Sequence, residues 1–222
     1  MGVEGAEASP PYHAAGVTRA QRPVLPAGGP QATYRALARA ADASAVVLVE
    51  GYSDQIAVET LAARQGRDLA QERVLVVPIG GAQAIGRFLA RFAAAKVAGL
   101  CDVGEEEVFR RGLERAGYGS NLSRAEMERL GFFVCVVDLE DELIRALTPS
   151  GVEAVLEEHG DIGPFRTFQK QPAWRGQSVA AQLRRFMSSA DRRKLRYAKL
   201  LVEALEPAQV PRPLTGVLAS IR

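Results

Sequence analysis

The strongest constraint in this 222-residue sequence is a set of apolar runs that each end at glycine or a carboxylate. The run 45–49 is followed by Glu50 and Gly51, and Asp54 comes four residues after Glu50. Three further apolar runs, 74–79, 97–101 and 132–137, stop at Gly80-Gly81, Asp102 and Asp138. Such continuous runs are typical of parallel strands that are buried on both faces. Because ligands bind at the carboxyl ends of parallel strands where the strand order reverses, we expect the acids to converge on one cleft.

Carboxylates gathered in one cleft repel one another unless protons or cations offset their charge. Oxygen ligands of this kind suit the hard cations Mg²⁺ and Mn²⁺. The pattern therefore indicates metal-dependent phosphate chemistry.

Composition excludes several other classes of protein. A hydrophobic content of 47% suits one well-buried domain with an appendage. No apolar run approaches the roughly 20 residues of a membrane span, and no basic region precedes an apolar core at the amino terminus. We therefore expect a cytoplasmic protein without membrane contact. Cys101 and Cys135 lie within apolar runs, and only His13 and His159 are histidines, so disulfide, zinc and histidine chemistry are not expected.

The net charge of +2 conceals an asymmetry between the two parts of the chain. Residues 161–222 hold 12 Lys and Arg against 4 Asp and Glu, whereas residues 1–160 hold 16 against 22. An acidic cleft beside a basic segment suits a polyanion that binds near a metal. A solvated helical surface with unremarkable charge is the alternative.

The alternation of strands and helices predicts a doubly wound, mostly parallel α/β core. Helices are expected from about 31–42, 53–65 with Ser53 as cap, 82–95, 105–116, 123–130 with a Ser123–Glu126 capping box, a segment opened by the acids after Asp138, 151–159, 178–187 and 191–205. The segment 165–176 is expected to be a loop, and Pro207, Pro211 and Pro213 are expected to end regular structure. The predicted parts are a tail over 1–30, the core over 31–147 and a helical basic extension over 148–222 packed on the core.

Glu50 and Asp54 should point over the same sheet edge, because the Gly51 turn is tight. In the alternative, Asp54 only supports the helix dipole and Glu50 is exposed. Asp102 ends another strand, and Glu105 could reach the same cation or only charge a helix start. Among the four acids after 132–137, Glu140 is the preferred ligand, followed by Asp138. Asp141 and Glu142 are interpreted as charges at a helix amino terminus.

These motifs resemble a known domain family. The order Leu48-Val49-Glu50-Gly51 with Asp54, then Asp102, then Asp138-Leu139-Glu140 resembles the TOPRIM domain of topoisomerases, primases and OLD-family (overcoming lysogenization defect) nucleases. The segment 168–171, Phe-Gln-Lys-Gln, and the carboxyl-terminal Lys…Tyr-Ala helix are closer to the OLD type. The resemblance extends over residues 45–218 and implies a TOPRIM-like, Rossmann-like fold.

The resemblance implies that Glu50, Asp54, Asp102 and Glu140 bind divalent cations, two Mg²⁺ or Mn²⁺ ions, that promote phosphodiester hydrolysis. The sequence departs from the family at the second member of its Asp-x-Asp pair, which falls at Gly104. Glu105 could compensate for the missing carboxylate. OLD-type nucleases also carry an ATPase domain, but this chain has no Gly-x-x-x-x-Gly-Lys-Ser/Thr pattern. We therefore expect no nucleotide cofactor here, and any ATPase would be a separate subunit.

The basic segment supplies candidate phosphate contacts. On an ideal helix Lys194 shares a face with Ala198, Leu201 and Leu205, so it is predicted to point inward. The resemblance assigns a functional lysine to this helix, whereas the alternative is a lysine that snorkels at the edge of the stripe. The further candidates for nucleic-acid contacts are Lys170, Trp174 and Arg175 in the predicted loop, and Arg192, Arg193 and Arg196, which are predicted to face away from the apolar stripe. Trp174 could stack on an unpaired base or pack beneath its loop.

The leading hypothesis is a metal-dependent endonuclease that hydrolyses DNA, with one cation activating water and another stabilising the leaving oxygen. A TOPRIM ribonuclease acting on structured RNA shares the same acids, and DNA is preferred here as the partner. A third hypothesis, supported by Gly104, is a catalytically weak nucleic-acid-binding module that regulates an ATPase partner. A homodimer is compatible with the sequence.

Overall fold

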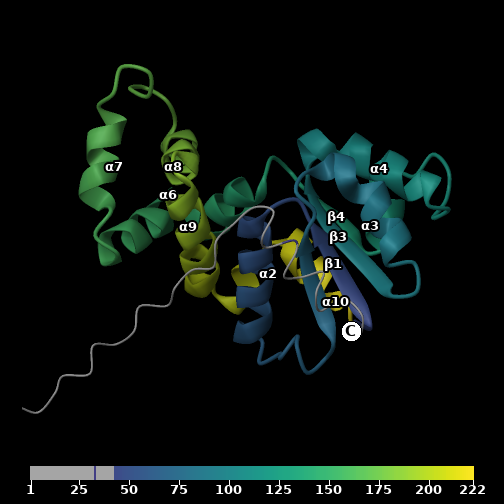
Figure 1. The fold of residues 1–222 in the computed structure, drawn as a ribbon. Helices are drawn as coiled ribbons and strands as arrows, with labels where there is room; N and C mark the ends of the chain where they lie inside the picture. Colours follow the sequence, from purple (N-terminus) through teal and green to yellow (C-terminus); the bar gives the residue numbers. More distant parts are fainter. Residues whose placement is uncertain (1–32, 34–42) are drawn as a thin grey trace, which may run out of the picture.

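The computed structural model describes Thr33 and residues 43–222. The predicted tail over 1–30 and the rest of the predicted helix over 31–42 lie outside the described residues. The described residues form a parallel sheet with helices on both faces, which confirms the predicted α/β fold (Figure 1). The strands of this sheet are β1 (Ala45–Val49), β2 (Val74–Pro78), β3 (Lys96–Asp102) and β4 (Phe132–Cys135).

The order of the strands reverses at the edge where the sequence predicts a cleft. The sheet runs β2-β1-β3-β4, and β1 pairs in parallel with both β2 and β3. The chain moves from β1 to β2 on one side and then returns to β3 on the other. In open α/β sheets, ligands bind beyond the carboxyl ends of the strands at such a reversal. Here the reversal lies between the ends of β1 and β3.

Helices cover both faces of the sheet. One face packs against α3 (Ile85–Arg91), α4 (Glu106–Arg115) and α5 (Arg124–Arg129), and the other against α2 (Tyr52–Arg64), the first part of α6 (Leu139–Glu158) and α10 (Arg212–Ala219). Alternate residues of β1 serve the two layers, since Val46 and Leu48 join one core and Val47 and Val49 the other. All four are fully buried. This double burial explains why the strand has no polar alternation.

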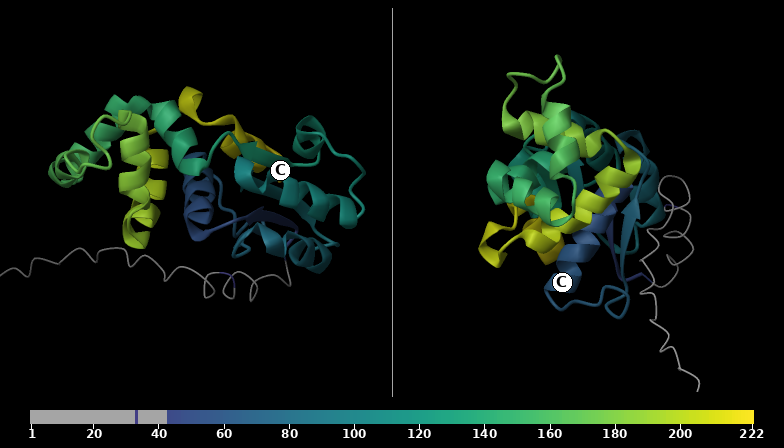
Figure 2. Two further views of the ribbon diagram at one scale, coloured as in Figure 1. Left: turned by 90° about the horizontal axis from the view of Figure 1, so that it is seen from above. Right: turned by 90° about the vertical axis from the view of Figure 1, so that its left-hand side faces the viewer.

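A helical lobe extends beyond the sheet (Figure 2). It consists of the second part of α6, α7 (Ile162–Gln169), α8 (Val179–Ser188) and α9 (Asp191–Ala204). Thr148 has a φ of 65° and precedes Pro149, so the backbone kinks there within α6. The lobe has an aromatic centre, in which the rings of Phe165 and Phe168 lie 5.3 and 5.7 Å from that of Phe186. The kink lies where the sequence predicts the helical extension to begin, and that division of the chain stays a prediction.

The prediction of a loop over 165–176 is wrong at its beginning. Helix α7 occupies 162–169, with Pro164 in its first turn, where a missing N–H costs little. Phe165 and Phe168 are three residues apart and therefore reach the same aromatic centre. Packing of these rings against Phe186 stabilises α7. The polar and basic residues between them give the sequence the pattern of a loop.

The prediction that prolines end regular structure after residue 207 is also wrong. Pro211 and Pro213 lie at the start of α10, where proline is tolerated. Leu214, Val217 and Leu218 of α10 are buried, and the helix packs against β4 and β3. The carboxyl-terminal segment therefore returns to the core.

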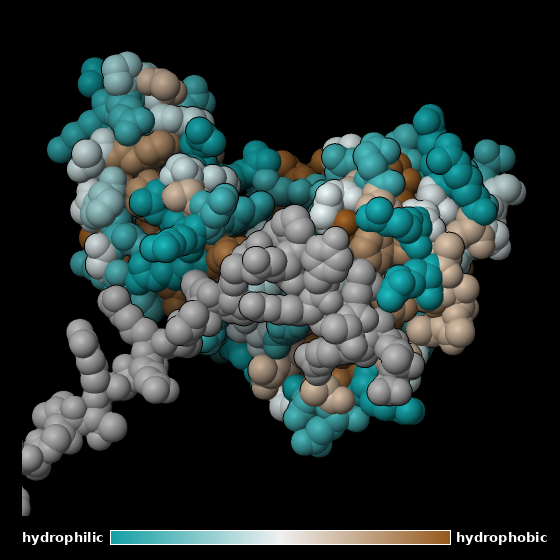
Figure 3. All heavy atoms as spheres, in the orientation of Figure 1, coloured by the Kyte–Doolittle hydropathy of each residue, from teal (hydrophilic) through white to brown (hydrophobic). Residues whose placement is uncertain are grey.

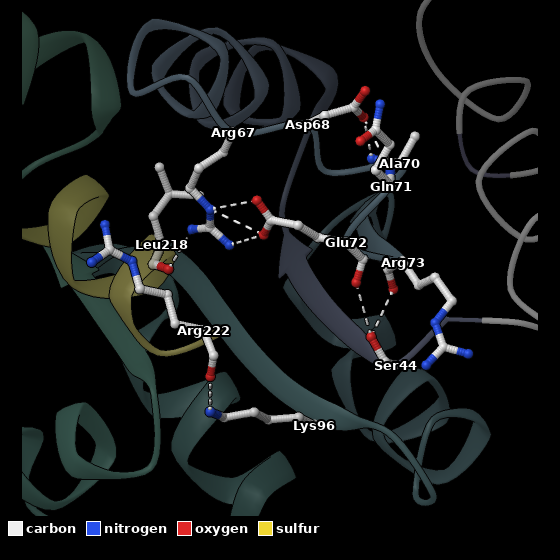
Figure 4. A network of polar contacts seen from close by, with 10 residues as sticks. All are labelled: Ser44, Arg67, Asp68, Ala70, Gln71, Glu72, Arg73, Lys96, Leu218 and Arg222. Carbon is white, nitrogen blue, oxygen red and sulfur yellow. Dashed lines mark hydrogen bonds and ion pairs between the residues drawn. The ribbon is translucent and has the colours of Figure 1, made fainter.

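Polar contacts fasten α10 to the amino-terminal edge of the sheet (Figure 4). Arg67 forms an ion pair of 2.5 Å with Glu72 and also donates a 2.8 Å hydrogen bond to the carbonyl of Leu218. Lys96, the first residue of β3, donates to the carbonyl of Arg222 at 2.9 Å. This network lies at the opposite end of the strands from the acids.

Three smaller expectations differ from the structure. Gly51 is the cap residue of α2, while Ser53 is a buried residue of its first turn. Strand β4 stops at Cys135, and Val136 and Val137 are 56% and 38% exposed, because the chain turns away from the sheet there. Helix α3 ends at Arg91 rather than at 95. The capping box of Ser123 and Glu126 is confirmed at the start of α5.

On the face that Figure 3 shows, hydrophilic residues make up much of the coloured surface, and the outline dips between the helical lobe and the α3–α4 side. Thr33 donates a hydrogen bond of 2.6 Å from its hydroxyl to the carbonyl of Pro78, at the end of β2. Within the described part of the chain, no helix has the length and apolar character needed to span a membrane.

Candidate metal centre

Glu50 connects the ends of the two central strands. It follows the last residue of β1, and its Oε1 accepts a 2.8 Å hydrogen bond from the backbone N–H of Asp102. Its own carbonyl accepts hydrogen bonds from Gly80 and Gly81 at 3.1 and 3.2 Å. Both glycines have positive φ, 76° and 109°, which side chains rarely allow. The turn that these glycines form after β2 thus fixes the backbone of Glu50.

Asp54 lies in the first turn of α2, near Glu50. Its Oδ2 accepts a hydrogen bond of 2.8 Å from the N–H of Gly51, so the side chain supports the helix start. The same carboxylate lies within electrostatic range of Glu50 and Glu140. Asp54 therefore fits both readings of the sequence, since it caps α2 and also faces the acidic edge of the sheet.

The acids at this edge perturb one another. Burial raises the pKa of Asp102 to about 8, and the charges of Glu50 and Asp54 add to the effect. Burial also raises the pKa of Asp54 to about 7, although the N–H of Gly51 acts in the opposite direction. For Glu50, burial raises the pKa and the N–H of Asp102 partly offsets this. Ionised together, these carboxylates destabilise the edge unless a cation joins them.

Gly104 and Glu105 stand where the sequence departs from the family pattern. Gly104 is exposed, and a Cβ on it would meet nothing within 4 Å. Glu105 takes the cap position of α4, but its side chain makes no cap hydrogen bond. Its charge raises the pKa of Glu50, so the two carboxylates interact electrostatically. This arrangement favours the interpretation that Glu105 faces the acidic edge over a role as a helix-start charge alone.

Asp138 and Glu140 follow β4, and each pairs with a basic side chain of the helical lobe. The Oδ1 of Asp138 caps α6 through the N–H of Asp141 at 2.8 Å, and its Oδ2 lies 2.5 Å from Nη2 of Arg184. Glu140 is buried, and its Oε1 lies 3.3 Å from Nζ of Lys194. Both carboxylate oxygens of Asp138 therefore take part in structural contacts, whereas Glu140 pairs only with Lys194 among the described residues.

Glu142 is more than the helix-start charge that the sequence predicts. It is 5% exposed, its Oε1 accepts a 2.8 Å hydrogen bond from the N–H of Val136, and its Oε2 pairs with Arg145 at 2.8 Å. Asp141 pairs with the same arginine at 2.7 Å. These contacts fix the segment between β4 and α6, and with it the position of Glu140.

Lys194 faces the acids, as its helical position predicts. Its side chain is 41% exposed and contacts Glu140. Burial acts to lower its pKa, but the carboxylates of Glu140, Asp54 and Asp102 raise it overall. The ammonium group is therefore kept charged beside the acidic edge, which a lysine that snorkels into solvent would not require.

The chemistry of these side chains suits a hard divalent cation, since Glu50, Asp54, Asp102 and Glu140 offer carboxylate oxygens. Within residues 43–222 and Thr33, however, no three such groups are close enough to hold a metal ion as arranged here. Glu50 and Asp54 point to backbone N–H groups and Glu140 points to Lys194. Binding of a cation by three or more of these groups thus requires their side chains to move closer together.

The predicted basic contacts differ in exposure and in their partners. Arg192, Lys170 and Arg175 are exposed, and Arg175 donates a 3.3 Å hydrogen bond to the carbonyl of Lys170. The prediction that Arg193 and Arg196 face away from the packed side of α9 is wrong. Arg193 lies 4.1 Å over the ring of Phe186 and donates to its carbonyl at 3.1 Å, because α8 packs beside α9.

Arg196 forms an ion pair of 2.9 Å with Asp161, which also accepts a hydrogen bond from the hydroxyl of Tyr197. Trp174 stacks on Phe168 with ring centres 5.3 Å apart, which agrees with packing beneath its loop. Both side chains thus contribute to packing of the lobe. Their predicted contacts with nucleic acid stay predictions.

Sequence reasoning missed Arg184. It lies on α8 and reaches Asp138, 46 residues away along the chain. Its place in the basic segment was the only signal available. The direction in which α8 faces depends on how the lobe folds back over the sheet, and no local pattern encodes that.

Comparisons with known proteins bear on the domain family and on the fold. Residues 43–102 match the family model described as overcoming lysogenization defect protein-like, TOPRIM domain. This segment contains Glu50, Asp54 and Asp102 together with strands β1 to β3. A comparison with curated protein sequences gave no significant match.

Two solved structures show the same fold over most of the chain. The C-terminal region of the Xanthomonas campestris pv. campestris OLD protein is 21% identical, with a TM-score of 0.57, and the match covers 81% of this chain and 94% of that one. The C-terminal region of the Burkholderia pseudomallei OLD protein is 18% identical, with a TM-score of 0.58, covering 81% and 97%. The chain therefore has the α/β fold of these TOPRIM-containing structures. More particularly, residues 43–102 match the model of an OLD-like TOPRIM domain.

Proposed function

We propose that this protein is a divalent-metal-dependent endonuclease that hydrolyses phosphodiester bonds of DNA. The observation that carries the proposal is the group of four acids, Glu50, Asp54, Asp102 and Glu140, at the reversal of strand order. Because these carboxylates repel one another, a bound cation would stabilise this edge of the sheet. The OLD-like TOPRIM match over residues 43–102 supports the same chemistry.

In this proposal Glu50 and Asp102 hold the same cation, because they end adjacent parallel strands and already contact one another. Asp54 and Glu140 complete the set of oxygens from the starts of α2 and α6, and Glu105 adds a carboxylate near Glu50. Bound Mg²⁺ or Mn²⁺ would supply an activated water and charge neutralisation at the phosphate. Lys194 contributes a fixed positive charge toward the oxygen that becomes negative during cleavage.

The test is cleavage of plasmid DNA and of structured RNA by the purified protein with Mg²⁺ or Mn²⁺. We expect metal-dependent DNA cleavage that Glu50→Gln abolishes while the far-ultraviolet circular dichroism spectrum stays unchanged. Glu203→Gln is the matched control, because Glu203 is half-exposed on α9 and pairs only with Lys199 among the described residues. Cleavage at the original rate by Glu50→Gln, with the same metal dependence, would show that the site is wrong. Cleavage restricted to RNA would replace DNA with RNA as substrate.

A second candidate function is a regulatory module that binds nucleic acid but scarcely cuts it. Gly104 favours this candidate, because the position where the family has a second aspartate is empty of side-chain atoms. Such a module would bind DNA with a strong dependence on salt and show no metal-dependent cleavage. The same plasmid assay, combined with a binding measurement, therefore separates the two functions.

A further inference from the structure

The geometry points to Arg184 as a phosphate-binding residue that the helical lobe holds ready beside the acidic edge. This inference rests on the proposed function for the identity of the ligand, which is a phosphate of bound nucleic acid next to the one being cut. Asp138 acts in it as a positioning residue, because it fixes the guanidinium group without contacting the substrate.

The contact between Arg184 and Asp138 uses only part of the guanidinium group. Nε and Nη2 of Arg184 lie 2.6 and 2.5 Å from the same oxygen, Oδ2 of Asp138. Among the described residues, Nη1 has no hydrogen-bond partner. The edge formed by Nη1 and Nη2 therefore keeps N–H groups available. A guanidinium edge binds two phosphate oxygens in parallel, which is the geometry that makes arginine a preferred phosphate ligand.

Exposure agrees with this role. The Arg184 side chain is 44% exposed, whereas that of Asp138 is 14% exposed. The aspartate is thus the buried anchor and the arginine is the accessible partner. Asp138 also caps α6, so its carboxylate cannot follow the arginine if the lobe moves.

Arg184 lies on the substrate side of the molecule. Its partner Asp138 is two residues before Glu140 and acts electrostatically on Asp102. Lys194 contacts Glu140 from the next helix, α9. The lobe therefore places two basic side chains, Arg184 of α8 and Lys194 of α9, beside the acids that follow β4. Arg193 and Arg196, in contrast, are occupied inside the lobe by Phe186 and Asp161.

The neighbouring residue Arg185 is a matched control. It is exposed on the same helix and carries the same charge, but a helix turns about 100° per residue, so it points elsewhere. Loss of either arginine removes one positive charge from the protein. Only Arg184 is expected to contact a phosphate directly.

The experiment measures binding of a short labelled DNA duplex by fluorescence anisotropy, with Ca²⁺ in place of the catalytic cation. We expect Arg184→Gln to weaken binding about tenfold or more and to reduce the slope of log affinity against log salt by about one. Arg185→Gln should change affinity less than about threefold, because a solvated charge acts only through screened attraction. In the cleavage assay, Arg184→Gln should raise KM and leave kcat almost unchanged. Equal affinities for the Arg184 and Arg185 variants would overturn the inference.

Asp138→Asn distinguishes a binding role from a purely structural ion pair. Asparagine caps helices about as well as aspartate, so α6 is preserved while Arg184 loses its anchor but keeps its charge. DNA affinity should then fall about threefold below that of Asp141→Asn, because that control also removes a negative charge but leaves Arg184 held by Asp138. If the pair only fastens the lobe to the core, Arg184→Gln and Asp138→Asn should lower the melting temperature alike, and neither should differ from its control in DNA binding.

Failure of this inference and failure of the proposed function remain distinguishable. DNA binding that depends on Arg184 without any cleavage would support the inference and remove the nuclease. Cleavage that depends on Glu50, with equal binding by the Arg184 and Arg185 variants, would support the nuclease and remove the inference. A wild-type protein that binds no DNA would overturn the assignment of Arg184.

Discussion

At the scale of single residues, Gly104 decides how complete the acidic edge is. It follows Asp102 by two positions, and the space around it is open. The φ of Gly104 is not positive, so the backbone conformation there allows a side chain. An aspartate there would place a further carboxylate beside Asp102 without steric conflict.

We therefore predict that Gly104→Asp tightens binding of Mn²⁺ by about tenfold and increases any cleavage activity. Isothermal titration calorimetry with Mn²⁺ measures the affinity directly. The control is Gly163→Asp, because Gly163 also lies in open space but on α7 of the lobe. Unchanged affinity in the Gly104 variant would mean that the cation lies away from this side of Asp102.

Glu105 gives the complementary prediction. Its charge acts on Glu50 and its side chain makes no cap contact, so Glu105→Gln should weaken Mn²⁺ binding by about tenfold. Glu107→Gln serves as the control, because Glu107 is exposed and pairs with Arg110 and Arg111. Equal metal affinities for both variants would reduce Glu105 to a charge at the start of a helix.

At the scale of elements, the helical periodicity of α9 places the ammonium group of Lys194 beside the acids. Lys194 lies one turn before Ala198 and contacts Glu140, whereas Lys199 on the same helix pairs with Glu203. We predict that Lys194→Ala lowers the single-turnover cleavage rate about a hundredfold and weakens DNA binding much less. Lys199→Ala should leave both almost unchanged. A Lys194 variant that loses only affinity or only thermal stability would make this residue a phosphate contact or a packing lysine.

Helix α10 offers a prediction about stability. A Cβ on Gly216 would lie 2.2 Å from Cε1 of Phe133, so the glycine lets the helix approach β4 closely. Gly216→Ala should destabilise the fold by about 1–3 kcal/mol, because the ring is buried and cannot move freely. Chemical denaturation measures this loss, and Gly163→Ala is the control, since a Cβ there meets nothing within 4 Å. Equal stability of both variants would show that Phe133 repacks.

The elements also show what a single sequence can predict. The strands and the acids that end them were readable, because parallel strands buried on both faces are continuous apolar runs and their ends share one edge. Helices α7 and α10 were missed, because contacts with Phe186 and Phe133 stabilise them and these contacts are distant in sequence. The orientation of Arg193 and the contact between Arg184 and Asp138 were missed for the same reason.

At the scale of the whole molecule, the acidic edge opposes the stability of the fold that carries it. Asp102 ends a buried strand, and the charges of Glu50, Asp54, Asp138 and Glu140 act against its ionised form. Carboxylates held together for cation binding are a strain that the rest of the structure must offset. A cation that binds only the folded protein should relieve this strain.

We therefore predict that Mn²⁺ or Mg²⁺ raises the melting temperature of the wild-type protein, with a gain of about 2.7 kcal/mol when the free cation is about 100 times its Kd. Asp102→Asn should make the metal-free protein more stable, on the order of 1 kcal/mol, since it removes a carboxyl group whose ionisation the fold opposes. The same variant should lose the response to metal, because its amide cannot replace a carboxylate ligand. Differential scanning fluorimetry with and without chelator measures both effects in one experiment. Glu158→Gln, an exposed position at the end of α6, controls for loss of one negative charge. A metal-free Asp102→Asn protein that is less stable than wild type, or one that keeps the full metal response, would show that Asp102 stabilises the fold and does not hold the cation.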